Sequence, residues 1–257
     1  MDLNKQDKLE ATIAALQDRW GNKAIGQLRA SNGSDISCVP TGFPALDDAL
    51  ITGGLPRGRI SEINGVPSSG MATIALKIMI NAQAQKSAAV YIDLEQNFDP
   101  AYAARCGLAL EQVVLVRPRD VSQALVILQD FVLGAEIGIL VFDAALKLLA
   151  ESQASQALAT TLGRLIAPLA RAQGVLLFLI SLPANSPAIA IGDPINSTLA
   201  HFATVRLFIQ RVRWIYRQQD IGGYQAQVLV LKNKLGPAGK QANINVMFSD
   251  DADDDVL

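Results

Sequence analysis

The stretch GVPSSGMAT, residues Gly65 to Thr73, has the spacing of a phosphate-binding loop but lacks two of the side chains that such loops use. The complete motif is G-x-x-x-x-G-K-[ST], in which backbone N–H groups surround phosphate, the lysine reaches the outer phosphates and the hydroxyl holds magnesium. Met71 and Ala72 stand at the lysine and hydroxyl positions. The sequence therefore predicts the shape of a phosphate-binding loop, formed by Gly65, Val66, Pro67, Ser68, Ser69, Gly70, Met71, Ala72 and Thr73.

The two replaced residues should weaken triphosphate binding less than they reduce the rate of phosphoryl transfer. A charged hydrogen bond contributes roughly 1.5 to 3 kcal/mol, so the missing lysine weakens triphosphate binding by about ten- to a hundredfold or more. Phosphoryl transfer depends on the same cation and on a metal ion, so we expect little or no hydrolysis. Thr73 is a poor substitute for the missing hydroxyl, because one residue turns a helix by about 100°. Considered alone, the stretch is equally compatible with a tight glycine turn that leads into a helix.

The segments around the loop predict an α/β fold. Short apolar strands are expected at 59–64, 88–95, 113–118, 137–143 and 174–181, and helical segments at 71–85, 100–106, 121–133 and 152–172. Alternation of helices with nearly all-apolar strands is typical of a mostly parallel central sheet covered by helices on both faces.

The two ends of the chain differ from this pattern. An amphipathic N-terminal helix is expected at 8–20, followed by a linker rich in Ser, Asn and Gly. An antiparallel C-terminal hairpin is expected from strands 204–216 and 224–234 with the turn RQQDIGG at 217–223, and a last strand at 242–248. We therefore predict three parts: the helix and linker at 1–36, the α/β core at 37–248 and an acidic, disordered tail at 249–257.

Composition limits the classes of function. The chain has 257 residues, of which 50% are hydrophobic, and a formal net charge of −2, which argues against a basic coat for nucleic acid. Cys38 and Cys106 have no paired spacing that suggests a metal site or a disulfide framework. The first twenty residues are charged and the apolar runs are short, so we expect a cytoplasmic protein that does not cross a membrane.

Four stretches, in this order along the chain, resemble the bacterial recombinase RecA: PTGFPALDDALITGGLPRGRISEINGVPSSG, YIDLEQNFDPAYAARCGL, ILVFD and VLVLKNKLGPAGKQANINV. The resemblance implies a RecA-like P-loop core, with a first helix similar to the one that docks on an adjacent RecA protomer. It provides no counterpart of the family's C-terminal domain.

The same resemblance assigns roles to individual residues. Glu95 looks like the carboxylate that activates the attacking water, Asp143 like the acid that orders magnesium, and Tyr102 like the aromatic residue that stacks on adenine. Lys232 and Lys234 resemble the pair that reaches a nucleotide bound to the neighbouring subunit. Each also has an ordinary alternative: strand-end carboxylates, a packing residue and a solvated turn.

Other positions depart from the family. Ser181 and Leu182 replace a polar Asn-Gln pair that reports the state of the γ-phosphate to the DNA-binding loop. The segment after Asp143 is shortened relative to the first DNA-binding loop of the family, and 183–202 is more apolar than expected of the second. Binding of DNA in the family's manner is therefore not expected.

A different nucleic-acid surface is a further candidate. Arg211 and Arg213 lie with Trp214 on one predicted strand, a combination suited to single-stranded DNA through phosphate contacts and base stacking. Arg211, Arg213 and Arg217 share parity, so a regular strand would present them on one face. The alternative is an amphipathic hairpin with a solvated basic side.

The leading hypothesis is a DNA repair or recombination accessory protein without ATPase activity. It would assemble with itself, with a RecA-type protein or with a polymerase partner, and would bind ATP and magnesium weakly. One alternative is a DNA-dependent ATPase completed by Lys232 and Lys234 from the next subunit. Another is a single-stranded DNA binder that needs no nucleotide.

Overall fold

The chain divides into two compact units, residues 1–35 and 36–257. The structure is a computed structural model that describes residues 3–21, 36–134, 137–143, 152–182, 194–217 and 220–247. The first unit contains α1 (Leu3–Trp20), so the expected N-terminal helix is present and begins earlier than predicted. The predicted acidic tail, 249–257, lies outside the described residues. Among the described helices, none combines the length and apolar character needed to cross a bilayer.

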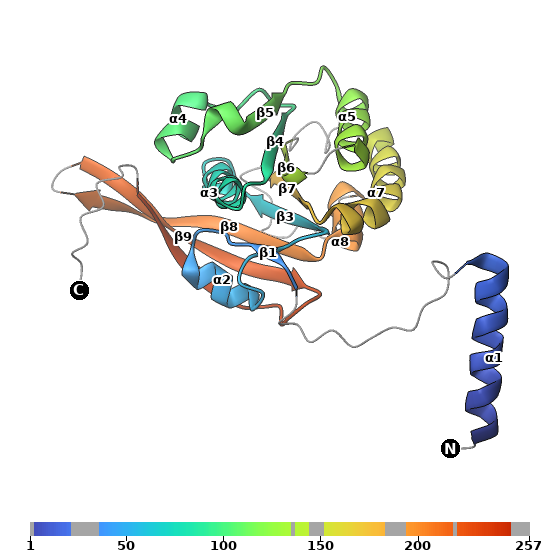
Figure 1. Ribbon diagram of the computed structural model, residues 1–257. Coiled ribbons are helices and arrows are strands. Elements are labelled where there is room, and N and C mark those ends of the chain that lie inside the picture. Colours follow the sequence, from blue (N-terminus) through green and yellow to red (C-terminus); the bar gives the residue numbers. More distant parts are fainter. Residues whose placement is uncertain are drawn as a thin grey trace. The chain divides into compact units, whose positions relative to one another are not determined.

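The second unit is built on a sheet in the order β10-β9-β8-β3-β7-β6-β4-β5 (Figure 1). Neighbouring strands from β8 to β5 are parallel, whereas β9 and β10 are antiparallel to their neighbours. This confirms the predicted mostly parallel sheet with an antiparallel C-terminal hairpin. The strands are β3 (Arg59–Gly65), β4 (Ala88–Asp93), β5 (Val113–Val116), β6 (Ile137–Asp143), β7 (Val175–Ser181), β8 (Val205–Arg217), β9 (Asp220–Asn233) and β10 (Gln241–Met247).

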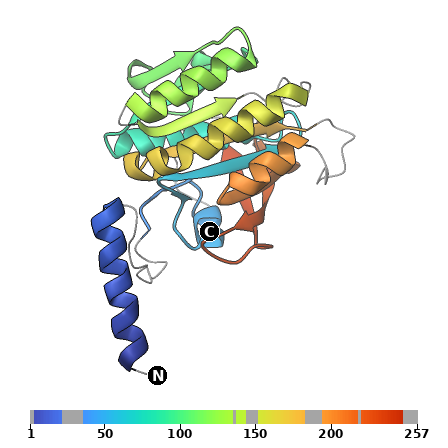
Figure 2. The same cartoon turned by 90° about the vertical axis from the view of Figure 1, so that its right-hand side faces the viewer.

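Helices cover both faces of this sheet (Figures 1 and 2). Strand side chains alternate between the two faces, so that Val141 joins one core and its neighbour Phe142 joins the other. The first core includes residues of α2 (Pro44–Leu50), α3 (Met71–Ala84) and α4 (Pro100–Arg105). The second includes residues of α5 (Val121–Gly134), α7 (Ser152–Ala172) and α8 (Pro194–Phe202). The central strands are buried on both sides, as their continuous apolar sequences indicated.

Several short elements were not predicted. They are α2, α8, the 3₁₀ turn η2 (Leu110–Gln112) and the small antiparallel pair β1 (Cys38–Val39) and β2 (Leu55–Pro56). Two-residue strands have no periodicity for a sequence pattern to reveal. Gly54 allows this pair to form, because it has φ +149° and a Cβ there would lie 2.2 Å from the Val39 carbonyl oxygen.

The connection of the hairpin lies within the predicted stretch 217–223 but is shorter, because β8 continues through Arg217 and β9 already begins at Asp220. The glycines of that stretch serve another purpose. Gly223 pairs with Met247 of β10, and a Cβ on Gly223 would lie 2.3 Å from the Val246 carbonyl oxygen. Glycine is therefore required for close packing of strands and does not mark the turn.

A buried ion pair joins the two halves of the sheet. Glu62 of β3 lies opposite Arg206 of β8, and its side chain has no exposed surface. Arg206 donates from Nε to Glu62 Oε2 at 2.7 Å and from Nη2 to Oε1 at 3.2 Å. This two-point contact satisfies both oxygens of a carboxylate that would otherwise be costly to bury.

Candidate functional site

A cavity of about 560 Å³ lies where the phosphate-binding loop follows the carboxyl end of β3. The carboxyl ends of parallel strands are the usual place for ligands in α/β sheets. The cavity brings together most of the predicted site: loop residues 67–73, Glu95, Tyr102 and Asp143. Arg211, Trp214 and Tyr224 of the hairpin also line it.

The phosphate-binding loop adopts a conformation that demands its glycines. Gly70 precedes α3 with φ +104°, and a Cβ there would lie 2.3 Å from Tyr224 Oη. A Cβ on Gly65 would lie 2.9 Å from the Ile209 carbonyl oxygen. The Ser69 side chain is 1% exposed, and its Oγ has no hydrogen-bond partner among the described residues. The loop therefore keeps a tight backbone at a helix N-terminus, the arrangement that suits an anion.

Thr73 directly follows the position at which the motif's hydroxyl is missing, and its own hydroxyl contacts two tyrosines. Its Oγ1 lies 2.7 Å from Tyr102 Oη, and Tyr224 Oη donates to it at 3.4 Å. Burial, the largest influence, raises the pKa of Tyr102 to about 12, so its hydroxyl stays protonated and available for this contact. The position of Tyr102 is fixed by Asp99, whose side chain accepts from the Tyr102 backbone N–H at 3.1 Å at the start of α4.

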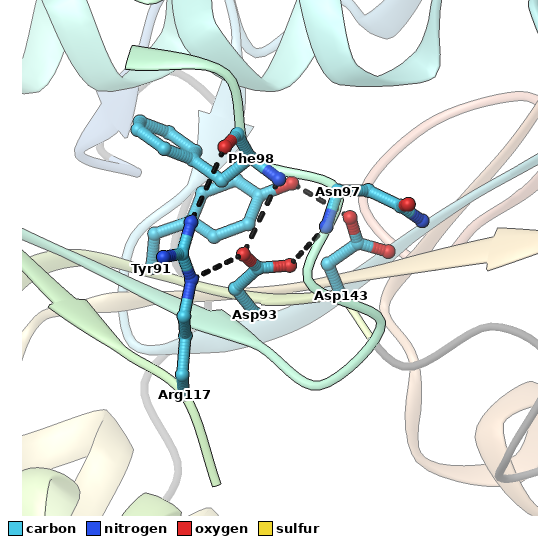
Figure 3. Close-up of polar contacts among 6 residues, drawn as sticks. All are labelled: Tyr91, Asp93, Asn97, Phe98, Arg117 and Asp143. Carbon is cyan, nitrogen blue, oxygen red and sulfur yellow. Dashed lines mark hydrogen bonds and ion pairs between the residues drawn. The ribbon is translucent and has the colours of Figure 1, made fainter.

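Asp143, which lines the cavity, and the nearby Asp93 have different environments (Figure 3). Asp143 Oδ2 accepts a hydrogen bond from Tyr91 Oη at 2.8 Å. Burial raises the pKa of Asp143 to about 6, with smaller increases from the charges of Asp93 and Glu95, although the Tyr91 donor lowers it. Asp143 therefore keeps its proton to a higher pH than a solvent-exposed aspartic acid does.

Asp93 is the neighbouring carboxylate in the same view (Figure 3). Its oxygens accept from the backbone N–H groups of Asn97 at 2.8 Å and Phe98 at 3.2 Å. Arg117 Nε donates to it at 3.2 Å, so this fully buried side chain is both hydrogen-bonded and ion-paired. Neither Tyr91 nor Asp93 was singled out from the sequence, although both lie in the strand that leads to Glu95.

These donor groups fit a phosphate better than they fit magnesium. Ala72 has no oxygen and the Thr73 hydroxyl contacts two tyrosines, so neither residue offers the free hydroxyl that holds magnesium in the complete motif. Among the described residues there is also no group of three His, Cys, Asp or Glu side chains that could hold a metal ion. The loop backbone, by contrast, requires no particular side chain to meet an anion.

Arg211 and Trp214 extend the site from the hairpin. Arg211 Nη1 donates to the Ser68 carbonyl oxygen at 3.3 Å, and its guanidinium carbon lies 4.0 Å from the centre of a Trp214 ring. Trp214 in turn meets Tyr224 edge to face at 6.1 Å.

The expectation that Arg211 and Arg213 share a face is wrong. The ladder between β8 and β9 shifts register between them, so Arg211 lies opposite Ala226 and Arg213 lies opposite the adjacent Gln225. A bulge of this kind adds one residue to the strand, so the side chains after it point to the face opposite to the one expected for regular alternation. Arg213 donates from Nε to Gln225 Oε1 at 3.1 Å, whereas Trp214, opposite Tyr224, lines the cavity.

The remaining predicted residues lie elsewhere. Lys232 donates to the Ala200 carbonyl oxygen, and Lys234 donates to that of His201 at 3.2 Å, both in the last turn of α8. Burial, followed by the charge of Lys234, lowers the pKa of Lys232. These contacts suit cations at a helix C-terminus, and a role at a neighbouring subunit stays a prediction.

The departures from the family pattern divide between described and undescribed residues. Ser181 lines the cavity, and the Leu182 backbone N–H donates to the Gly65 carbonyl oxygen at 2.7 Å. Most of the two segments compared with DNA-binding loops, 144–151 and 183–193, lies outside the described residues.

Comparison with known proteins agrees with this arrangement. The family model described as the RecA N-terminal domain matches residues 7–253. Protein RecA of Herpetosiphon aurantiacus is 32% identical over 262 residues, which cover 96% of this chain and 73% of that protein. Protein RecA of Rhodospirillum rubrum is 30% identical over 266 residues, covering 96% and 72%.

Proposed function

The chain belongs to the RecA family of recombination and repair proteins, and from that premise we propose that it is an accessory member that does not hydrolyse ATP. The observation that carries the proposal is the phosphate-binding loop, where Met71 and Ala72 offer neither charge nor oxygen. In an active site of this class, bound ATP and magnesium supply the phosphoryl group and the neutralising charge. Here the chain supplies a shaped cavity without the two side chains that would hold the metal and the outer phosphates.

The carboxylates support the same proposal. Glu95 lines the cavity where a water-activating base would be needed. Burial raises the pKa of Asp143 to about 6, so the ionised form that a metal ligand requires is favoured only above that pH. When the metal ion and the lysine are both missing, a general base alone stabilises little of the charge that develops on a transferring phosphoryl group.

Assembly is the proposed mode of action. In α1, Leu9 is 59% exposed and Leu16 is 40% exposed, with Ile13 between them at helical spacing. An apolar stripe of this kind needs a partner surface. By analogy with the family's first helix, we assign it to docking on a second copy, on a RecA-type protein or on a polymerase that works with one.

Restoring the two missing side chains tests the proposal. The variant Met71→Lys plus Ala72→Thr should bind ATP with magnesium about ten- to a hundredfold more tightly than the natural chain, because it regains a charged contact and a magnesium ligand. Isothermal titration calorimetry measures this directly. The matched control is Met71→Gln plus Ala72→Thr, which is similar in size but uncharged and should gain much less.

Turnover separates the proposal from its enzymatic rival, in which Lys232 and Lys234 of a neighbouring subunit replace the missing cation. Steady-state ATP hydrolysis should stay at background with and without single-stranded DNA. Clear turnover by the natural chain, abolished by Lys232→Ala, would establish the rival and end the accessory proposal.

A further inference from the structure

One positive side chain reaches the phosphate-binding loop from the hairpin. We propose that Arg211 supplies, within the same chain, the charge that residue 71 lacks, so that the cavity binds the phosphate groups of a nucleotide without magnesium. The accessory function above requires no ligand, so this inference goes beyond it.

The geometry of Arg211 carries the proposal. Its contact with the Ser68 carbonyl oxygen, at 3.3 Å, places the guanidinium against the loop itself. The Trp214 ring, 4.0 Å from the guanidinium carbon, holds the group flat. A guanidinium has five N–H donors and the Ser68 contact is made by Nη1, so it retains donors in the planar arrangement that suits a phosphate.

The loop offers a complementary partner on the other side. Ser69 lines the cavity, its side chain is almost completely buried, and its hydroxyl has no hydrogen-bond partner among the described residues. A buried hydroxyl without a partner costs free energy, so Ser69 gives the loop a hydroxyl whose hydrogen-bonding capacity is unused among the described residues. With the backbone N–H groups at the start of α3, Arg211 and Ser69 form the anion-binding part of a cavity that the carboxylates Glu95 and Asp143 also line.

A second cavity adjoins the one described above. It favours a nucleotide as the ligand over free phosphate or a nucleic-acid backbone. It has a volume of about 400 Å³ and shares Thr73 and Tyr102 with the first. Lys77, Asn243 and Asn245 also line it, and they provide polar groups for a sugar and a base. A ligand that carries phosphate at one end and a nucleoside at the other would use both cavities.

Calorimetric titration of the full chain with ADP and with pyrophosphate, in EDTA, tests the inference. We expect ADP to bind without metal and added magnesium to change its affinity by less than about threefold. Arg211→Gln should weaken binding roughly tenfold or more, the effect of losing one charged contact. Arg213→Gln, two residues along the strand and hydrogen-bonded to Gln225, is the matched control and should change affinity by less than about twofold.

Tryptophan fluorescence gives an independent measurement of where the ligand binds. The chain has two tryptophans, so a Trp20→Phe variant reports on Trp214 alone. ADP in EDTA should change this signal, and Arg211→Lys should keep part of the binding because it keeps the charge.

The results that would overturn the inference are distinct from those that would overturn the accessory function. They are absence of binding in EDTA, a strict need for magnesium, or equal losses in Arg211→Gln and Arg213→Gln. A fluorescence change with a single-stranded oligonucleotide but not with ADP would instead assign the arginines to DNA. None of these results would produce ATP turnover, which is what the accessory function excludes.

Discussion

Replacing Arg206 by methionine should lower the free energy of unfolding by about 3–5 kcal/mol, the usual cost of leaving one partner of a buried ion pair uncompensated. Glu62 has no exposed surface, and its two carboxylate oxygens accept hydrogen bonds from Arg206 at 2.7 and 3.2 Å. The pair joins β3, which leads into the phosphate-binding loop, to β8, which carries Arg211. Urea denaturation at neutral pH measures the loss.

Removing both charges distinguishes two causes of lost stability: a buried carboxylate that has lost its partner, and the loss of packing by the Arg206 side chain. Glu62→Gln combined with Arg206→Met should recover much of the stability lost in Arg206→Met alone, because no charge then remains buried. A single variant within about 1 kcal/mol of the natural chain would show that Glu62 finds water or another donor.

The second large effect is a gain in stability. Asp143→Asn should raise the free energy of unfolding at pH 7.5 by up to about 3 kcal/mol, since each unit of pKa shift corresponds to about 1.4 kcal/mol. Folding raises the pKa of Asp143 from 3.8 to about 6, mainly by burial. Between these values the native state binds more protons than the unfolded chain, so the contribution of this group to stability falls as pH rises through that window.

The pH dependence is the measurement that identifies this cause. The difference between Asp143→Asn and the natural chain, from urea denaturation, should be small near pH 4, grow to about pH 6 and then level off. Tyr91→Phe removes the donor that lowers the pKa of Asp143, so the pH dependence should extend to higher pH. A variant less stable than the natural chain at pH 7.5 would mean that the ionised carboxylate is the favoured form. Protein sites that retain such a group sacrifice stability for function.

The sequence predicts the sheet and the loop because their signals are local. The predicted apolar strands of six to eight residues and the spacing of Gly65 and Gly70 are visible within short windows. Asp143 could be placed in the cavity for the same reason, since it directly follows the apolar strand ILVF.

The contacts that define the chemistry of the site are not local. Tyr91 reaches Asp143 across 52 residues, and Tyr224 reaches Thr73 across 151 residues. No periodicity connects such positions. The hairpin turn was predicted too long for a related reason: Gly223 is small because Val246 and Met247 of β10 pack against it, and these two residues lie more than twenty positions further along the chain.

The register shift in β8 determines the electrical character of the cavity wall. In a strand that alternated regularly, Arg213 would follow Arg211 into the cavity and the indole of Trp214 would face away. Val212 is the unpaired residue between them. Because of this extra residue, the uncharged Trp214 ring lies where a second cation would have stood. Among the described residues of the hairpin, one inserted residue thus leaves Arg211 as the arginine at the loop and places the Trp214 ring against its guanidinium.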